Sequence, residues 1–224
     1  MSDAERLGPG EHLPPWIWAE HVARFRFAAS MVAGKRGVEC ACGSGLGTKN
    51  LAEAGALAIR AYDVSDAAGS LAWRDASHDT IALKAADGRD LPCPSAWADI
   101  YVALKTIEHV HDEEAFLREA VRVLRPGDTF LCSTPNRRVS TPERGPSDKP
   151  VNSFHVREYS ESEFVTLSGR HFDALTLYGQ NSRRRRRMKG PSALARGVSP
   201  RVAERASGAL DHVRYLRGGT QPAR

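Results

Sequence analysis

After a leader rich in Gly, Pro and mixed charge, the chain begins with a helical pattern of apolar residues. Between Pro14 and Gly34 apolar side chains recur at alternating steps of four and three, and this spacing predicts one face of a helix that ends before Gly34. The recurring positions are Trp18, Val22, Phe25, Ala29 and Val32. Because one face of this helix is apolar, we expect it to pack against another apolar surface.

Short apolar segments with the composition of strands follow the helix. They cover residues 37–42, 56–64, 80–84, 100–104 and 129–133. Between the last two of them, residues 112–124 have a helical pattern that is acidic in its first turn and stops at Pro126-Gly127. Strands that alternate with helices predict an α/β fold with a doubly wound, mostly parallel sheet and helices on both faces.

The chain after residue 136 is less regular. A polar stretch of about 20 residues leads to Ser160, which with Glu163 has the spacing of a capping box at a helix start. Residues 172–178 predict a further strand, a final helix is expected from Ser199 to Val213, and no strand that closes the sheet is evident after Tyr178. We therefore expect one domain, 1–224, made of a flexible leader (1–13), a core (14–180) and a basic loop with a C-terminal helix (181–224).

The composition is typical of a single domain without a membrane span. A chain of 224 residues can form one α/β core but not two, so we expect one active site. No apolar run approaches the roughly 18 residues of a membrane span, and residues 1–10 lack the pattern of a secretory signal, which predicts a cytoplasmic protein. The four cysteines lack paired spacing, so we expect reduced core thiols and no metal site.

The net charge of +5 comes from one short run. Arg183 to Arg187 are consecutive, and without them the chain is close to neutral. Adjacent arginines could neutralise RNA phosphates, which makes RNA an alternative partner. No aromatic residue is interleaved with the arginines to stack on a base, so we favour a solvated loop and expect no nucleic-acid partner.

A glycine-rich loop follows the first predicted strand. Gly43, Gly45 and Gly47 lie where a strand ends and a helix begins, and there backbone N–H groups can approach a ligand closely. Asp63 lies about 20 residues further on, at the end of the next predicted strand, where a carboxylate can accept hydrogen bonds from both hydroxyls of a ribose. Together they predict a nucleoside cofactor.

The spacing of this loop favours a sulfonium cofactor over a dinucleotide. A pyrophosphate prefers a Gly-x-Gly-x-x-Gly loop without a carboxylate, whereas here the third glycine comes one residue early. Glu39 precedes the loop at a place suited to the ammonium group of a methionine moiety.

A series of motifs between residues 20 and 180 resembles the class I S-adenosylmethionine-dependent methyltransferases, which have a Rossmann-like fold. Within that family the resemblance points to a bacterial branch that decorates glycans and small molecules. The motifs are Glu20-His21-Val-Ala-Arg24-Phe25, the loop 41–45, Asp87-Gly-Arg-Asp-Leu91-Pro92, Asp99, Thr106-Ile-Glu108-His109, Arg122-Val-Leu-Arg-Pro126-Gly127, Ser133-Thr-Pro-Asn136 and His155-Val-Arg-Glu158-Tyr159. The sequence departs from the branch at Gly37, Lys105 and Asp128.

The resemblance implies S-adenosylmethionine as the cofactor and residues that bind it. Gly43 and Gly45 would face its carboxypropyl end, Asp63 its ribose, and Asp87 its adenine amino group. The implied cofactor set is Glu39, Ala41, Gly43, Ser44, Gly45, Asp63, Val64, Asp87, Gly88, Leu91 and Leu104, with Gly88 and Leu91 around the adenine ring. An N-terminal lid helix and a C-terminal helical extension complete the fold that we expect.

Methyl transfer is an in-line displacement at a sulfonium, so the enzyme mainly has to hold the acceptor behind the methyl group. His109, just after the fourth predicted strand, is the leading general base for an acceptor that must lose a proton. The sequence leaves open that His109 instead fixes the loop beside Glu108. His111 and His155 are weaker candidates for the base.

The polar stretch and the first helix supply the expected acceptor site. Arg157, Glu158 and Tyr159 either contact the acceptor or anchor the stretch, and Trp16 either lines the pocket mouth or packs. The expected acceptor set is Trp16, His111, Asn136, His155, Arg157, Glu158 and Tyr159.

These predictions lead to one primary hypothesis and two alternatives. We expect methyl transfer to an amine or hydroxyl of a small polar acceptor, a sugar-containing natural product such as an aminoglycoside-type amino sugar. The alternatives are an RNA methyltransferase that uses the arginine run and a non-catalytic binding protein. A homodimer has no specific support in the sequence.

Overall fold

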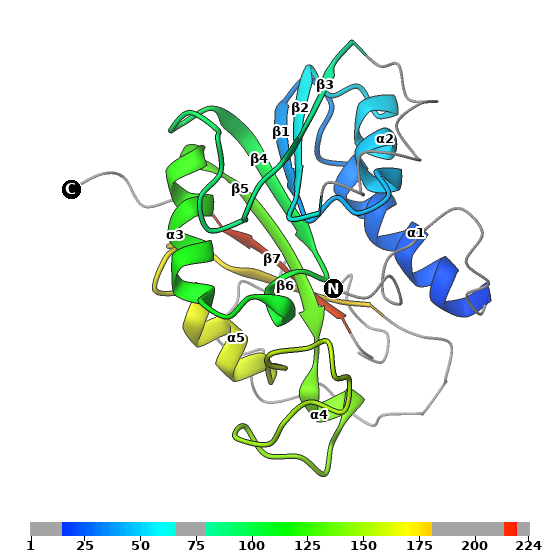
Figure 1. The fold of residues 1–224 in the computed structure, drawn as a ribbon, viewed down its shortest axis with the longest axis vertical. Coiled ribbons are helices and arrows are strands. Elements are labelled where there is room, and N and C mark those ends of the chain that lie inside the picture. Colours follow the sequence, from blue (N-terminus) through cyan, green and yellow to red (C-terminus); the bar gives the residue numbers. More distant parts are fainter. Residues whose placement is uncertain (1–14, 66–78, 181–212, 219–224) are drawn as a thin grey trace.

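The computed structural model describes residues 15–65, 79–180 and 213–218, which form a sheet with helices on its two faces (Figure 1). The helices are α1 (Pro15–Ala29), α2 (Leu46–Glu53), the short 3₁₀ helix η3 (Ile107–His109), α3 (Glu113–Val123), α4 (Arg137–Ser140) and α5 (Glu161–Ser168). The strands are β1 (Arg36–Cys40), β2 (Ala58–Asp63), β3 (Ile81–Ala85), β4 (Ala98–Leu104), β5 (Leu124–Pro135), β6 (Thr176–Gln180) and β7 (Val213–Gly218).

The sheet has the strand order β3-β2-β1-β4-β5-β7-β6. Neighbouring strands from β3 to β5 are parallel, and β7 is antiparallel to both β5 and β6. The order reverses between β1 and β4, and in an open parallel sheet such a reversal creates a crevice at the carboxyl ends of the strands. The predicted α/β class, with a mostly parallel sheet and helices on both faces, is confirmed.

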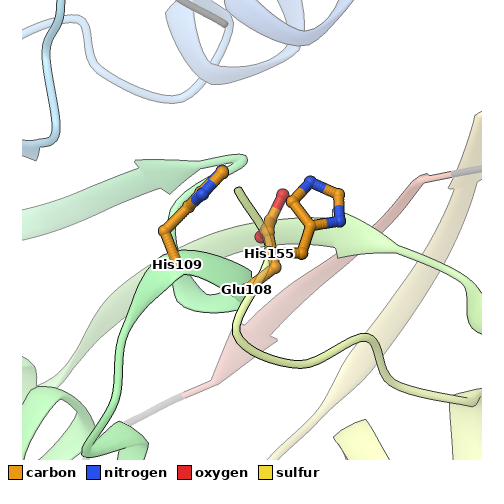
Figure 2. A group of neighbouring side chains, drawn as sticks. All are labelled: Glu108, His109 and His155. Atoms are coloured by element: carbon orange, nitrogen blue, oxygen red, sulfur yellow. The ribbon is translucent and has the colours of Figure 1, made fainter. Parts of the chain in front are cut away.

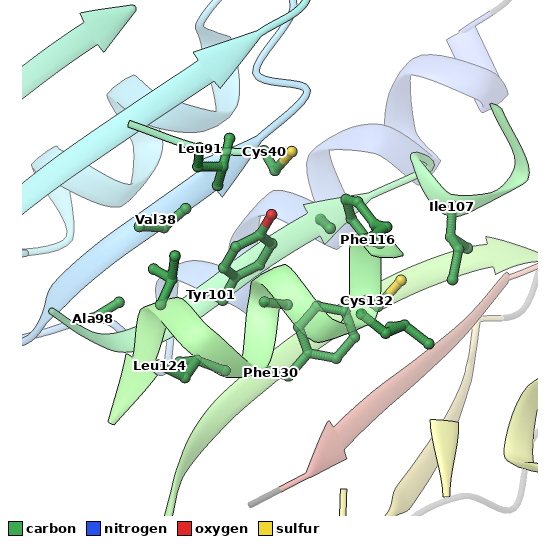
Figure 3. Packing of buried hydrophobic residues seen from close by; sticks show 14 of the residues in the cluster. Val38, Cys40, Leu91, Ala98, Tyr101, Ile107, Phe116, Leu124, Phe130 and Cys132 are labelled. Atoms are coloured by element: carbon green, nitrogen blue, oxygen red, sulfur yellow. The ribbon is translucent and has the colours of Figure 1, made fainter. Parts of the chain in front are cut away.

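The side chains of β4 alternate between two cores, one on each face of the sheet. Ile100 and Val102 enter the core beneath α1 and α2, whereas Tyr101 enters the core beneath α3 and α5. Figure 3 shows Tyr101 beside Phe116 of α3 and Phe130 of β5, with ring centroids 6.2 Å and 5.6 Å from its own. A strand buried on both faces holds the crevice in place because neither face can move without disturbing a core.

Helix caps fix the starts of α3 and α5, which border the loops near the crevice. The Asp112 side chain accepts a hydrogen bond from the Ala115 N–H at 2.9 Å. Ser160 and Glu163 form the reciprocal capping box predicted from their spacing, with the Ser160 N–H donating to Glu163 at 2.7 Å. Both loops therefore end at positions that the local sequence specifies.

The first helix is shorter than predicted, and one residue of its predicted apolar face is exposed. It ends at Ala29, and a turn follows that reaches Gly34, whose φ is +71°. Val32 is buried after the end of the helix, whereas Trp18 is 42% exposed. The prediction for Trp18 is wrong because the N-terminal turns of α1 extend beyond the sheet, as Figure 1 shows.

The C-terminal strand corrects two predictions. Val213 begins β7, so the helix predicted from Ser199 cannot include it, and the prediction that no closing strand follows Tyr178 is wrong. A short strand of this kind forms because it pairs with β5 and β6, and local periodicity does not reveal such distant partners. The strand predicted at 172–178 starts later, at Thr176. The rest of the predicted C-terminal helix and the arginine run lie outside the described residues.

Two predictions from composition are tested by the structure. All four cysteines are free and buried, as expected for core thiols; they are Cys40, Cys42, Cys93 and Cys132. Within the described ranges no helix has the length and apolarity needed to cross a membrane.

Candidate functional site

A pocket with a volume of about 290 Å³ lies at the carboxyl ends of β1, β2, β3 and β4. This is the crevice that the reversal of strand order creates. Most of the predicted cofactor residues line it, namely Ala41, Gly43, Ser44, Asp63, Val64, Asp87, Gly88 and Leu104. Glu39, Gly45 and Leu91 are not among the lining residues.

The loop between β1 and α2 has a backbone that favours glycine. Gly43 and Gly45 have φ values of +52° and +79°, and Gly45 is the residue immediately before α2. Residues other than glycine rarely adopt this region, although Ala41 does so here with φ +61°. Ser44, Leu46 and Gly47 line the pocket, so the positive end of the α2 dipole lies beside it.

Asp63 connects this loop to the end of β2. Its Oδ2 accepts a hydrogen bond from the Gly43 N–H at 2.9 Å, and its Oδ1 accepts one from the Ser65 N–H at 3.0 Å. The residue is 6% exposed and lines the pocket. A carboxylate has about four lone-pair sites, so these contacts leave Asp63 able to accept hydrogen bonds from a ligand as well.

Two further glycines are required by close packing around the pocket. A Cβ on Gly47 would lie 2.2 Å from Oε1 of Glu39 and 2.5 Å from the Phe25 ring. A Cβ on Gly88 would lie 2.7 Å from Sγ of Cys40 and 3.0 Å from the Phe116 ring. Glycine is therefore needed at 47 to let α1 approach α2, and at 88 to let the turn after β3 lie against the end of β1.

The structure places Glu39 beneath the loop rather than on the pocket surface. It is 4% exposed, and its carboxylate accepts a hydrogen bond from the Thr48 hydroxyl in α2. Burial raises the pKa of Glu39 to about 7, although the hydrogen bond from Thr48 opposes the shift. Leu91, a second member of the predicted set, is buried in the core, and its N–H donates to Glu119 at 2.6 Å.

Asp87 holds the turn after β3 through a two-point contact with Arg89. Its carboxylate oxygens lie 2.9 Å and 2.6 Å from Nε and Nη2 of Arg89. This hydrogen bonding lowers the pKa of Asp87, so the group is a carboxylate at neutral pH. Both residues line the pocket.

The other part of the pocket is lined by cationic, imidazole and aromatic side chains. His109 and His111 line it as the sequence predicts, and it also contains Lys105, Phe154 and His21. His21 comes from α1, where burial and then the charges of Arg24 and Lys105 lower its pKa to about 3. His21 is therefore a neutral imidazole at the pocket wall.

Lys105 and Glu108 form an ion pair directly after β4. Lys105 has φ +58°, and its N–H donates to the Ser133 carbonyl at 2.9 Å. Its Nζ lies 2.8 Å from Oε1 of the fully buried Glu108. Burial raises the pKa of Glu108, but the charge and hydrogen bond of Lys105 and the charge of His109 outweigh it and lower the pKa overall.

The predicted acceptor residues of the segment 136–159 do not line the pocket. Asn136 caps α4, Tyr159 is buried in the core, and Arg157 pairs with Glu113 at 3.0 Å. His155 and Glu158 form a buried pair with Nδ1 and Oε1 2.8 Å apart. The structure thus places these residues where they hold the segment together, and the side chain of Trp16 lies outside the described residues.

Several pocket residues were not assigned from the sequence. His21 and Phe25 lay inside the recognised first motif, but nothing in local spacing placed that helix against the glycine loop. Lys105 was noted only as a departure from the family pattern. Phe154 had no sequence signal, since its place depends on a contact between distant segments, in which its carbonyl lies 2.9 Å from Nδ1 of His109.

Comparisons with known proteins agree on one kind of domain. Residues 38–132 match the family of methyltransferase domains. A Mycolicibacterium smegmatis protein named as an S-adenosylmethionine-dependent methyltransferase is 34% identical over 163 residues, which are 73% of this chain and 61% of that protein. The chain thus spans only 61% of the length of that relative.

Two more distant relatives are named for specific acceptors. The 27-O-demethylrifamycin SV methyltransferase of Amycolatopsis mediterranei is 28% identical over 133 residues, covering 53% of this chain and 49% of its own. A ubiquinone/menaquinone biosynthesis C-methyltransferase of Caulobacter vibrioides is 50% identical over 56 residues, covering 25% and 22% of the two chains. These relatives methylate oxygen in one case and carbon in the other, by their names.

Solved structures share the fold at low identity. The Haloferax volcanii complex of a methyltransferase with the Trm112 activator aligns with a TM-score of 0.68 and 16% identity, covering 93% of both chains. An S-adenosylmethionine-dependent methyltransferase of Thermotoga maritima aligns with a TM-score of 0.64 and 17% identity, covering 92% of this chain and 94% of its own. The overall fold is therefore shared with known methyltransferases.

Proposed function

Because the chain belongs to the class I S-adenosylmethionine-dependent methyltransferases, we propose that it transfers a methyl group to a small polar acceptor. The observation that carries the proposal is one pocket in which the glycine loop, Asp63 and the Asp87-Gly88 turn face His109 and His111. When bound, S-adenosylmethionine supplies the methyl group on a sulfonium, and transfer needs no covalent intermediate with the protein.

The residues at the loop end of the pocket fit this cofactor. Asp63 is a buried carboxylate at the end of β2, the position from which ribose hydroxyls are bound in Rossmann-like folds. Gly88 lets the turn after β3 lie close to Cys40 and Phe116, which also line the pocket, so a flat adenine ring can lie against that turn. Asp87, held as a carboxylate by Arg89, can accept a hydrogen bond from the adenine amino group.

The opposite end of the pocket supports transfer to a group that loses a proton. His109 lies at the carboxyl end of β4, and its Nδ1 donates to the Phe154 carbonyl, so Nε2 carries the lone pair that can take a proton from a hydroxyl or ammonium. The imidazoles of His21 and His111 offer polar contacts to the acceptor. A sugar-containing natural product, such as an amino sugar, is the first acceptor class that we propose.

The cofactor half of the proposal is tested by titrating the full chain with S-adenosylhomocysteine in a calorimeter. Wild-type protein should bind with micromolar affinity, and Asp63→Ala should abolish the binding because it removes the ribose contact and the anchor of the glycine loop. Asp173→Ala, an exposed aspartate outside the pocket, is the matched control and should bind as the wild type does. Unchanged affinity in Asp63→Ala would rule out this assignment of the cofactor.

The acceptor half is tested by transfer of labelled methyl groups from S-adenosylmethionine to a panel of compounds. The panel contains amino sugars, glycosides, hydroxylated polyketides and a quinol, so that methylation at nitrogen, oxygen and carbon is distinguished. Total RNA is included because the run Arg183 to Arg187, which lies outside the described residues, makes RNA the alternative acceptor. Transfer to an amine or hydroxyl of a polar acceptor supports the proposal, whereas transfer to RNA alone or to quinol carbon alone contradicts it.

A further inference from the structure

Glu108, His109 and His155 form a cluster beside the pocket with the donor atoms of a metal site. One carboxylate oxygen and one nitrogen of each imidazole all lie within 4.8 Å of one another. Figure 2 shows the carboxylate of Glu108 beside both rings, which come from two segments far apart in the sequence. We propose that these three residues bind a divalent transition-metal ion of the zinc class.

The backbone holds the two segments of the cluster together. The N–H groups of Val156 and Arg157 donate to the Glu108 carbonyl at 2.7 Å and 3.3 Å. The ring centroids of His109 and His155 lie 5.0 Å apart, with the rings nearly perpendicular at 78°. The approach of the donor atoms is therefore set by main-chain contacts on both sides of the cluster, and does not depend on long flexible side chains.

The donor set is one that zinc-class ions prefer. Two imidazoles and a carboxylate form a common three-ligand site for Zn²⁺, which keeps a fourth position for water or a substrate. Bonds of about 2.0–2.2 Å place tetrahedral ligands about 3.4 Å apart, so rotations of the side chains from separations of up to 4.8 Å would complete the site. Imidazole nitrogen also favours such ions over Mg²⁺ and Ca²⁺.

Both histidines are oriented as metal-binding histidines usually are. Nδ1 of His109 donates to the Phe154 carbonyl at 2.9 Å, and Nδ1 of His155 donates to the Glu158 carboxylate at 2.8 Å. These partners place the proton on Nδ1 and the lone pair on Nε2 of each ring. The Asn152 amide, 3.1 Å from Nε2 of His155, is consistent with a lone pair there.

The carboxylate of the cluster is buried and only partly compensated. Glu108 is 0% exposed, and its Oε2 has no hydrogen-bond partner among the described residues. The cation beside it is Lys105, whose Nζ is 2.8 Å from Oε1 and whose side chain is 26% exposed. A buried carboxylate favours a nearby cation strongly, so a divalent ion competes with Lys105, which can turn toward solvent through the pocket.

The site would change the part that His109 plays in the pocket. His109 lines the pocket, so an ion held by the cluster would lie beside the end of the pocket that we assign to the acceptor. With the ion bound, His109 is a ligand, and its role as a base is confined to the metal-free protein. This consequence rests on the proposed methyl transfer, whereas metal binding itself does not.

Metal binding is tested with Co²⁺, whose visible absorption reports four-coordinate sites. The chelator-treated full chain is titrated at neutral pH, and Zn²⁺ is then added as a competitor. We expect a visible band that saturates at one equivalent of Co²⁺ and disappears with Zn²⁺. Glu108→Gln, His109→Gln and His155→Gln should each weaken binding at least about 100-fold because each loses a ligand.

Two more variants make the test specific. Lys105→Met should tighten Co²⁺ binding by roughly tenfold, since it removes the competing cation from Glu108. His171→Gln is the matched control, because His171 pairs with Glu114 at 2.6 Å outside the cluster and its loss should leave the spectrum unchanged. Titration of each variant with S-adenosylhomocysteine checks that it is folded and tests the proposed cofactor independently of the metal.

The outcomes separate the two proposals. A wild-type spectrum without a Co²⁺ band, or a band that survives all three ligand substitutions, overturns the metal site. Binding by Lys105→Met alone also overturns it for the native protein, since Lys105 then occupies the cluster. Co²⁺ binding without S-adenosylhomocysteine binding would instead retain the metal site and reject the proposed function.

Discussion

The two ends of the pocket are built in different ways. At the loop end, backbone conformation and close packing dominate: Gly43 adopts a positive φ, and Gly88 lies where any Cβ would touch Cys40. At the other end, the His109 side chain meets the Phe154 carbonyl because η3 and the segment before α5 pair through their backbones. The comparison teaches that local backbone conformation shapes the loop end, whereas the end at His109 depends on contacts between segments far apart in the sequence.

The largest effect is expected from His109→Gln, which changes chemistry at the acceptor end alone. In the metal-free protein, loss of a general base should lower kcat/KM by about 10²- to 10⁴-fold, while the affinity for S-adenosylhomocysteine stays within about threefold of wild type. Steady-state kinetics and calorimetry on the same preparation measure both quantities. His171→Gln serves as the control, and an unchanged rate in His109→Gln would assign His109 only to fixing the loop.

The loop end should respond to Gly47→Ala through stability. The added Cβ would lie 2.2 Å from Oε1 of Glu39 and 2.5 Å from the Phe25 ring. Overpacking of this kind costs about 1–3 kcal/mol of unfolding free energy, whereas alanine in place of glycine in a helix gains about 1 kcal/mol. With a cost near the upper limit, Gly47→Ala is less stable than the wild type. Urea unfolding of Gly47→Ala against Gly145→Ala, where the nearest contact is 3.6 Å, tests whether close approach demands the glycine.

The pH dependence of stability should separate the two ends by its sign. Burial raises the pKa of Glu39 from 4.5 to about 7, so the native state favours the protonated acid. The stabilisation of the native state by protonated Glu39 is fully present below the pKa of the unfolded chain, and it is lost as pH rises through the pKa of the folded protein. Between about pH 5 and pH 8, wild type should lose about 2 kcal/mol of unfolding free energy relative to Glu39→Gln.

Glu158 should show the opposite trend. Burial raises its pKa, but hydrogen bonds from Ser140 and His155 outweigh burial and lower the pKa below 4.5. The stabilisation of the native state by ionised Glu158 is therefore present above the pKa of the unfolded chain, and it is lost as pH falls through the lowered pKa of the folded protein. Unfolding of Glu158→Gln against wild type at acidic pH measures this, and the same sign at Glu39 and Glu158 would contradict the comparison.

The smallest effect is expected from Phe154→Ala. Phe154 lines the pocket and is 37% exposed, and the carbonyl that holds His109 belongs to the backbone and remains. We expect KM for the acceptor to rise about threefold to tenfold, equivalent to about 0.7–1.4 kcal/mol, with no change in cofactor affinity. Val151→Ala, exposed and outside the pocket lining, is the control, and equal effects would remove Phe154 from the acceptor site.

Elements with local signals were predictable from the sequence alone. The parallel strands, α3 with its Asp112 cap, and the capping box of Ser160 all follow from periodicity and residue type within a few neighbours. The glycine loop and Asp63 were predictable for the same reason, since a strand end, a turn of positive φ and a carboxylate at the next strand end are local features that the parallel fold then aligns.

Only the tertiary structure decided the closing strand and the acceptor end. Strand β7 depends on pairing with β5 and β6, and the predicted helix over Val213 failed because helical spacing carries no information about distant partners. His155 likewise became the neighbour of His109 through the hydrogen bond from Val156 to Glu108. The sequence thus determined the class of fold and the glycine loop, whereas long-range backbone pairing decided which side chains lie beside His109.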